Sequence, residues 1–161
     1  MTAVPQSATN WCWAACAEVV ILHAKSHAVA QCQFADWLLP HARCCAATPP
    51  SSTCDKPCAA SKIAPLYRHW GLSGATGNSV SVLFHGVQSE INAGRPIQVS
   101  FQYGSGCGHA VVVIGWQTAS SGDTVDVLDS AHLGRGSVLY NDLYTAFGMG
   151  GIWDWSWWNL A

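Results

Sequence analysis

The chain has 161 residues, half of them hydrophobic and a tenth charged, with a formal net charge of −2 at pH 7. This composition suits one folded domain with a substantial core and argues against disorder. Scattered lysines and arginines give no electrostatic footprint for nucleic acid, and no apolar run reaches the roughly 18–20 residues that a membrane span needs. We therefore expect a globular domain that binds neither nucleic acid nor membrane.

Cysteine content gives the first indication of compartment. Eight cysteines are too many for a typical reduced cytosolic protein and too few for a small disulfide scaffold. Five fall between Cys32 and Cys58, so we interpret this region as stapled by disulfides and the protein as secreted, acting outside the cell or delivered into a target cell. The chain as given contains no charged segment followed by an apolar core, so we expect no signal peptide within it. The cysteines are Cys12, Cys16, Cys32, Cys44, Cys45, Cys54, Cys58 and Cys107.

Helical patterns dominate the first part of the chain. Residues 11–25 (WCWAACAEVVILHAK) are apolar almost all round, which predicts a buried helix with Asn10 as its N-cap. A second helix is predicted over 31–39, before Pro40. Residues 41–58 combine prolines, cysteines and small polar residues, which predicts a loop held by its cysteines.

Two further helices precede a change of pattern. Residues 61–70 predict a short helix ended by Gly71, and residues 81–94 predict an amphipathic helix ended by Gly94. Runs of β-branched residues then predict strands, followed by a short helix and an aromatic tail. Helices first and an antiparallel sheet second indicate an α+β fold. The predicted strands are 96–103, 109–117, 123–129 and 136–142, the short helix is 142–147, and the tail is IWDWSWWNL.

The stretch QSATNWCWAAC contains the candidate nucleophile. Cys12 is predicted in the first turn of its helix, where unpaired backbone N–H groups and the helix dipole favour a thiolate. The second requirement is an imidazole, which His109 can supply from the start of a hydrophobic strand after a glycine-rich loop. Asp129 ends the strand expected to pair with that of His109, so its carboxylate can hold the Nδ1–H of the imidazole. Gln6 can direct its amide N–H at an oxyanion beside the Cys12 N–H.

These residues resemble a known family. Gln6, then five residues, then Cys12-Trp13-Ala14 resembles the active-site segment of papain-like cysteine peptidases, and the order Cys, His, Asp also matches. NWCWAACAEVV, QCQFA, the CC pair and CDKP are similar to a compact bacterial branch that includes staphopain-like effector peptidases and bacteriocin-leader-processing peptidases. AGRPIQVSF, GHAVVVIGW and LDSAHLGRGSVLYNDL extend the resemblance over nearly the whole chain. The sequence departs from papain in having Asp129 in place of an asparagine and a Cys-to-His spacing shorter than the roughly 130–150 residues typical there.

The resemblance implies one papain-like domain over 1–161, with a helical lobe over about 1–95 packed on a β lobe over about 96–161 and the active site between them. It implies a cysteine endopeptidase that works through a Cys-His-Asp triad and a thioester acyl-enzyme, without a cofactor or a metal. A protein or peptide is the expected substrate, a cognate inhibitor or pro-segment the possible partner, and a monomer the expected state.

Other interpretations stay open. The same triad could transfer acyl groups or deamidate glutamine in a toxin domain, and a non-catalytic, disulfide-stapled module could bind glycan through its tryptophans. His23 and His27, together with His41 and the cysteines between 44 and 58, could bind zinc, although irregular spacing favours disulfides. Cys16 could pack or form a bridge, and Cys107 could border the cleft or pair with a distant partner. For the tail, alternation favours one buried strand face formed by Trp153, Trp155 and Trp157 over a sugar-stacking surface.

Overall fold

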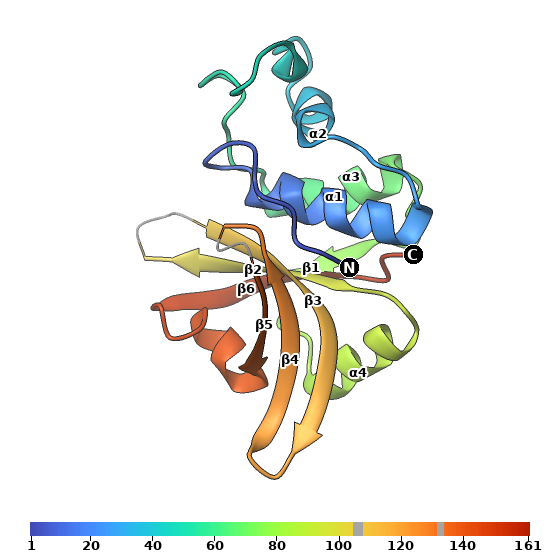
Figure 1. The fold of residues 1–161 in the computed structure, drawn as a ribbon, viewed down its shortest axis with the longest axis vertical. Coiled ribbons are helices and arrows are strands. Elements are labelled where there is room, and N and C mark those ends of the chain that lie inside the picture. The colour runs from blue at the N-terminus through green and yellow to red at the C-terminus, as the bar shows by residue number, and fades with distance from the viewer. Residues whose placement is uncertain (105–107, 132–133) are drawn as a thin grey trace.

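The structure, a computed structural model, describes residues 1–104, 108–131 and 134–161. Within these residues the helices lie mainly in the first half of the chain and the strands in the second (Figure 1). None of the helices in the described ranges is long and apolar enough to cross a membrane. The helices are α1 (Cys12–Lys25), α2 (Gln31–Leu38), the 3-10 helix η1 (Cys44–Ala46), α3 (Ala60–His69), α4 (Phe84–Asn92) and the 3-10 helix η2 (Tyr140–Thr145).

The strands form one antiparallel sheet. Among the described residues it has six strands, in the order β1-β6-β2-β3-β4-β5, so the predicted α+β class is confirmed. The long central strands are runs of β-branched residues, which suit a surface covered on both faces. The strands are β1 (Thr76–Asn78), β2 (Ile97–Tyr103), β3 (Gly108–Ala119), β4 (Gly122–Asp129), β5 (Gly134–Leu139) and β6 (Gly151–Trp158).

Each face of the sheet has its own core. In Figure 1, α1, α2 and α3 lie above the sheet, and α4 with η2 lies below it. The upper core joins α1 and its neighbouring helices to Ala110, Val112 and Leu128 of the sheet. The lower core contains Val87 of α4, Leu143 of η2 and the alternate residues of the central strands. Because β1 and α4 precede residue 95 yet belong to the sheet and its lower face, the helical and β parts of the chain interlock.

Three local predictions are wrong. Residues 76–78, which lie between two predicted helices where no strand is predicted, form β1 because they pair with β6. The strand predicted over 136–142 covers 134–139, and the chain turns into the 3-10 helix η2 at Tyr140. The predicted single face of Trp153, Trp155 and Trp157 is also wrong, because Trp153 belongs to the lower core and Trp157 to the upper one.

A β-bulge explains this division of the tryptophans. On β2, Ser100 pairs with Trp155 and Phe101 pairs with Trp153, which leaves Asp154 as an extra residue on β6. The extra residue reverses the alternation of the strand. Trp153 and Trp157 are 5% and 2% exposed, so the tail contributes to both cores instead of presenting a row of rings to solvent.

Candidate active site

Cys12 lies in the first turn of its helix, as predicted, and is the first residue of α1, although the predicted cap is wrong. The N-cap is Trp11, and no side chain caps the helix. Asn10 instead bonds the cysteine-rich loop of residues 41–58. Its backbone N–H donates to Asp55 Oδ1, and its side-chain Nδ2 donates to the Asp55 carbonyl. The first hydrogen bond of the helix runs from Ala14 N–H to the Trp11 carbonyl, so the N–H groups of Cys12 and Trp13 have no partner within the helix. Cys12 therefore lies where the helix end stabilises negative charge.

The tryptophans on either side of Cys12 hold the cysteine-rich loop. Trp11 is fully buried and its Nε1–H donates to the Cys54 carbonyl at 2.9 Å, while Trp13 Nε1–H donates to the Lys56 carbonyl at 3.1 Å. Both bonds reach from the first turn of α1 to residues that are distant in sequence. The stretch WCW thus fixes the start of α1 and the wall formed by residues 54–58 relative to each other.

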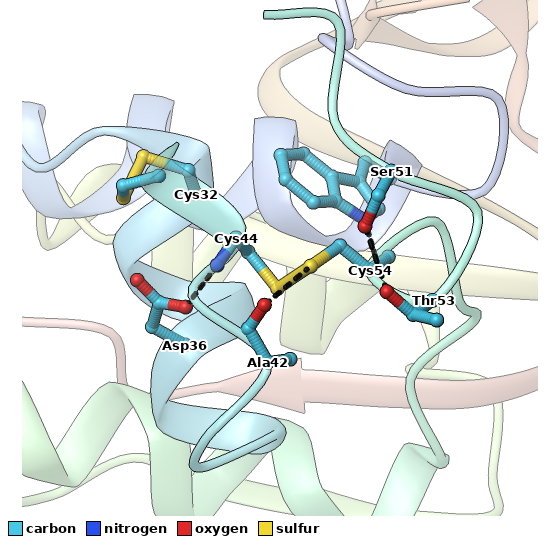
Figure 2. Close-up of a disulfide and its surroundings, with 9 residues drawn as sticks. Cys32, Asp36, Ala42, Cys44, Ser51, Thr53 and Cys54 are labelled. Carbon is cyan, nitrogen blue, oxygen red and sulfur yellow. Dashed lines mark hydrogen bonds between the residues drawn. A yellow bond between two sulfur atoms is a disulfide. The ribbon is translucent and has the colours of Figure 1, made fainter. Parts of the chain in front are cut away.

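Two disulfides staple this loop. Cys32 of α2 is bonded to Cys45, and Cys44 is bonded to Cys54. Figure 2 shows Asp36 accepting a hydrogen bond from the Cys44 N–H beside the second disulfide. Cys58 is a free thiol, so the prediction that it helps staple the loop is wrong, and Cys107 lies outside the described residues. No group of three or more His, Cys, Asp or Glu side chains in the described parts of the chain could hold a metal ion.

His109 and Asp129 lie side by side at one end of the sheet. His109 near the start of β3 and Asp129 at the end of β4 are joined by a 2.9 Å contact between Nε2 and Oδ1. The predicted use of Nδ1 for this contact is wrong. Because Nε2 faces the carboxylate, Nδ1 is the ring nitrogen left for Cys12. Asp129 Oδ1 also accepts the N–H of Ala131.

The other acidic residues of β4 have different partners. Asp123 accepts a hydrogen bond from Thr118 Oγ1, and Asp126 accepts one from Ser137 Oγ. Asp129 is therefore the carboxylate of this strand that meets His109.

The surroundings of His109 favour its charged form. Burial, the largest influence, lowers its pKa, but the hydrogen bonds to Asp129 and to Cys12, together with the negative charges of both groups, raise the pKa from 6.5 to about 9. The structure thus brings Cys12 within hydrogen-bonding reach of His109. At neutral pH the imidazole carries a proton, as a partner of a thiolate must.

Gln6 and Cys12 line one cavity between the helices and the sheet. The amide hydrogens of Gln6, however, bond the loop next to it. Its Nε2 donates to the carbonyls of Ala8 at 3.1 Å and Thr9 at 2.7 Å, and its buried Oε1 accepts no hydrogen bond from the residues that the structure describes. To donate into the cavity, the side chain has to release one of these carbonyls. The weaker bond, to Ala8, is the one that it would release most readily.

Gln31 holds the segment that carries Gln6. Its Oε1 accepts from the Ser7 N–H at 2.8 Å, and its Nε2 donates to the Pro5 carbonyl and to Glu18 Oε2, both at 2.9 Å. At 4% exposure Gln31 is buried with both ends of its amide satisfied. It therefore ties the N-terminal segment to α1 and α2 on both sides of Gln6.

A cavity of about 480 Å³ lies between the helices and the sheet. Its lining includes Cys12 and His109, and on the helical side Pro57, Cys58 and Ile63.

Burial raises the pKa of Cys58 to about 12, and burial also raises the pKa of Cys16 well above its usual range. Of the three free thiols among the described residues, Cys12 is thus the one with an imidazole partner, while burial keeps Cys16 and Cys58 protonated.

Sequence patterns did not indicate several residues of this site. Gln31 and Gln98 are isolated polar residues within apolar segments, and such residues are usually buried only when they are hydrogen-bonded. That rule could have marked both as structural or cavity-lining groups. Asp154 gave no such signal, because its orientation depends on the bulge in β6.

Comparison with known proteins places the chain in a family. The family model described as "Peptidase_C39 like family" matches residues 1–153. No curated protein matches the chain significantly.

Proposed function

The chain belongs to the Peptidase_C39 like family, of the papain-like cysteine peptidase clan, and on this premise we propose that it is an endopeptidase with Cys12 as the nucleophile, His109 as acid and base, and Asp129 as the residue that orients His109. The observation that carries the proposal is the arrangement of one thiol and one imidazole: Cys12 at a helix N-terminus, His109 within hydrogen-bonding reach, and Asp129 on the far nitrogen. This is the environment that makes a thiol nucleophilic.

In the proposed reaction the Cys12 thiolate attacks the carbonyl carbon of the scissile peptide. The oxygen becomes an oxyanion, which the Cys12 N–H and the Gln6 amide stabilise. The His109 imidazolium gives its proton to the departing amine, leaving a thioester on Cys12. Neutral His109 then takes a proton from water, whose oxygen attacks the thioester, and the acid product leaves with Cys12 restored as the thiolate and His109 as the imidazolium.

The disulfides and the upper core support two further parts of the proposal. We propose that the protein is exported, because Cys32–Cys45 and Cys44–Cys54 are bonds that persist in oxidising compartments. We also propose that residues 1–161 act as one domain, because the upper core joins the helices to the sheet.

Thiol labelling tests the nucleophile with a control inside the same chain. Iodoacetamide at pH 6 should alkylate Cys12 at least about a hundredfold faster than Cys58, because only Cys12 has an imidazolium partner. Peptide mapping should place the adduct on Cys12, and His109→Ala should slow the labelling of Cys12 and so reduce the difference from Cys58. Equal labelling of Cys12 in wild type and His109→Ala would refute the pairing.

Cleavage tests the reaction. Denatured protein substrates should be cut by the wild type and left intact by Cys12→Ala and Cys12→Ser. Fast labelling of Cys12 with ammonia release or amine transfer, and without chain cleavage, would instead identify an acyltransferase or a deamidase.

A further inference from the structure

The bulge in β6 points a carboxylate into the cavity that contains Cys12. Asp154 has no partner residue on β2, and its Oδ1 accepts the hydroxyl of Ser100 at 2.7 Å. Both residues line the cavity. Bulges commonly re-aim side chains next to active sites, and here the bulge places Asp154 on the sheet wall opposite the helical wall.

Within the part of the chain that the structure describes, Asp154 has no positively charged partner. Among the described residues that line the cavity, the charged groups are Asp154 and the Cys12–His109 pair, and none is a lysine or an arginine. The second carboxylate oxygen, Oδ2, accepts no hydrogen bond from the described residues. Lys62, a cation on the helical side, acts on Cys58 there. Among the described residues of the cavity lining, the Asp154 carboxylate therefore has no lysine or arginine to neutralise it.

A second observation points to a bound chain at the same wall. Gln98 and Ser100 are alternate residues of β2 and both line the cavity. Gln98 is fully buried, its Oε1 accepts the Tyr67 hydroxyl at 2.6 Å, and its Nε2 has no hydrogen-bond partner among the described residues. A buried donor without an acceptor is unfavourable unless a ligand or water supplies one. A carbonyl oxygen of a bound peptide is the matching acceptor.

From these contacts we infer that the cavity takes peptides with a lysine or arginine side chain close to the scissile bond, that Asp154 binds this cation, and that Gln98 Nε2 donates to a carbonyl of the same peptide. The inference rests on the proposed peptidase function for the choice of a peptide. A carboxylate with one oxygen fixed and the other open suits an ammonium or guanidinium group, because charge-assisted hydrogen bonds are the stronger kind. Ser100 fixes the carboxylate, so Asp154 is a specificity residue and takes no part in bond cleavage.

Peptide binding to the Cys12→Ala protein tests the inference without requiring turnover. The probes are fluorescent peptides of small neutral residues in which one lysine is placed in turn at each of six positions. At each position, matched peptides carry norleucine, glutamine or glutamate in place of the lysine. At one or two adjacent positions, lysine should lower Kd about five- to tenfold relative to norleucine. Asp154→Asn in the same background should reduce that ratio to about one, and Asp154→Lys should favour the glutamate peptide. Asp123→Asn, on the distant β3–β4 hairpin, is the matched control and should keep the wild-type ratio.

The outcomes separate the inference from the function on which it rests. A lysine-to-norleucine ratio near one at every position, a preference for glutamine, a lysine preference that survives Asp154→Asn, or no binding of any peptide would overturn the inference. Peptides that bind with the lysine preference but are not cleaved by the wild-type protein would refute the peptidase and leave the Asp154 site standing. Wild-type kcat/KM on the same peptides should follow the binding preference. Thermal melts of each variant confirm that the fold is retained.

Discussion

His109 Nε2 and Asp129 Oδ1 lie 2.9 Å apart, with both side chains 13% exposed. This contact determines which ring nitrogen is left for Cys12, and it is one of the interactions that keep the imidazole charged. An asparagine at position 129 keeps an oxygen for the hydrogen bond but loses the negative charge.

We therefore expect Asp129→Asn to reduce kcat/KM at pH 7 by about tenfold and Asp129→Ala by about a hundredfold, because the alanine variant also loses the orientation of the ring. Steady-state kinetics on one peptide substrate measures both. Asp126→Asn, whose carboxylate bonds Ser137 on the same strand, is the control. Equal activity of Asp129→Ala and wild type would contradict the role of Asp129.

The raised pKa of His109 sets the alkaline limit of activity. Its folded pKa is about 9, above the ordinary value of 6.5, so the imidazolium persists through neutral pH and is lost as pH rises through about 9. We expect kcat/KM to fall above this pH, and in Asp129→Asn to fall at a lower pH. A profile from pH 5 to 10.5 tests this, and an alkaline limb near pH 7 in the wild type would contradict it.

The same shift links His109 to stability. Because the folded protein binds this proton more tightly than the unfolded chain, the pair contributes stability that is complete below about pH 6.5 and disappears as pH rises through about 9. Urea unfolding of wild type and His109→Ala should therefore differ more at pH 6 than at pH 10. An unchanged difference between the two proteins at the two pH values would show that the pair does not couple to folding.

Gln6 should act on the chemical step more than on substrate binding. If its amide supports the oxyanion, Gln6→Ala should lower kcat by about ten- to a hundredfold with little change in KM. Gln6→Glu retains the length of the side chain but donates no N–H, so it should behave like the alanine variant. A purely structural role, through the bonds to Ala8 and Thr9, would instead lower Tm and leave kcat intact in the folded fraction.

Gly77 is required by close packing in β1. A Cβ at this position would lie 2.2 Å from Trp157 Cδ1 and 2.5 Å from its Nε1. Gly77→Ala should therefore lower the free energy of unfolding by about 1–3 kcal/mol. Gly136→Ala, in β5 with no atom within 4 Å of the added carbon, is the matched control and should change it by less than about 0.5 kcal/mol. Chemical denaturation compares the two.

The fold and the site were predictable to different extents. Residues 11–25 were assigned correctly because an apolar surface all round indicates a buried helix, and the long strands were assigned from their β-branched runs. Strand β1 could not be assigned, because Thr76–Asn78 has no strand pattern of its own and depends on pairing with β6. The bulge at Asp154 could not be predicted either, because it arises from how β6 pairs with β2 and not from the sequence of β6 alone.

At the site, helix position and residue order suggested Cys12, His109 and Asp129, but spacing alone does not place residues near each other. The resemblance supplied that expectation, and the structure then corrected the ring nitrogen from Nδ1 to Nε2. Asn10 fits the statistics of N-caps, yet it bonds Asp55, because the loop of residues 41–58 folds back over the start of α1. Cap propensity is local and does not anticipate such a partner.

The indole bonds from Trp11 and Trp13 connect the reactive sulfur to the stapled loop, and this connection bears on the redox conditions in which the protein can work. A thiol that reduces an oxidised Cys12, whether a sulfenic acid or a mixed disulfide, also reduces the Cys44–Cys54 disulfide. Reduction of that disulfide releases the covalent constraint on residue 54, whose carbonyl accepts the Trp11 indole N–H. Turnover plotted against glutathione concentration should accordingly rise, reach a plateau and decline. The protein would then be most active at an intermediate glutathione concentration and less active in both strongly oxidising and strongly reducing surroundings.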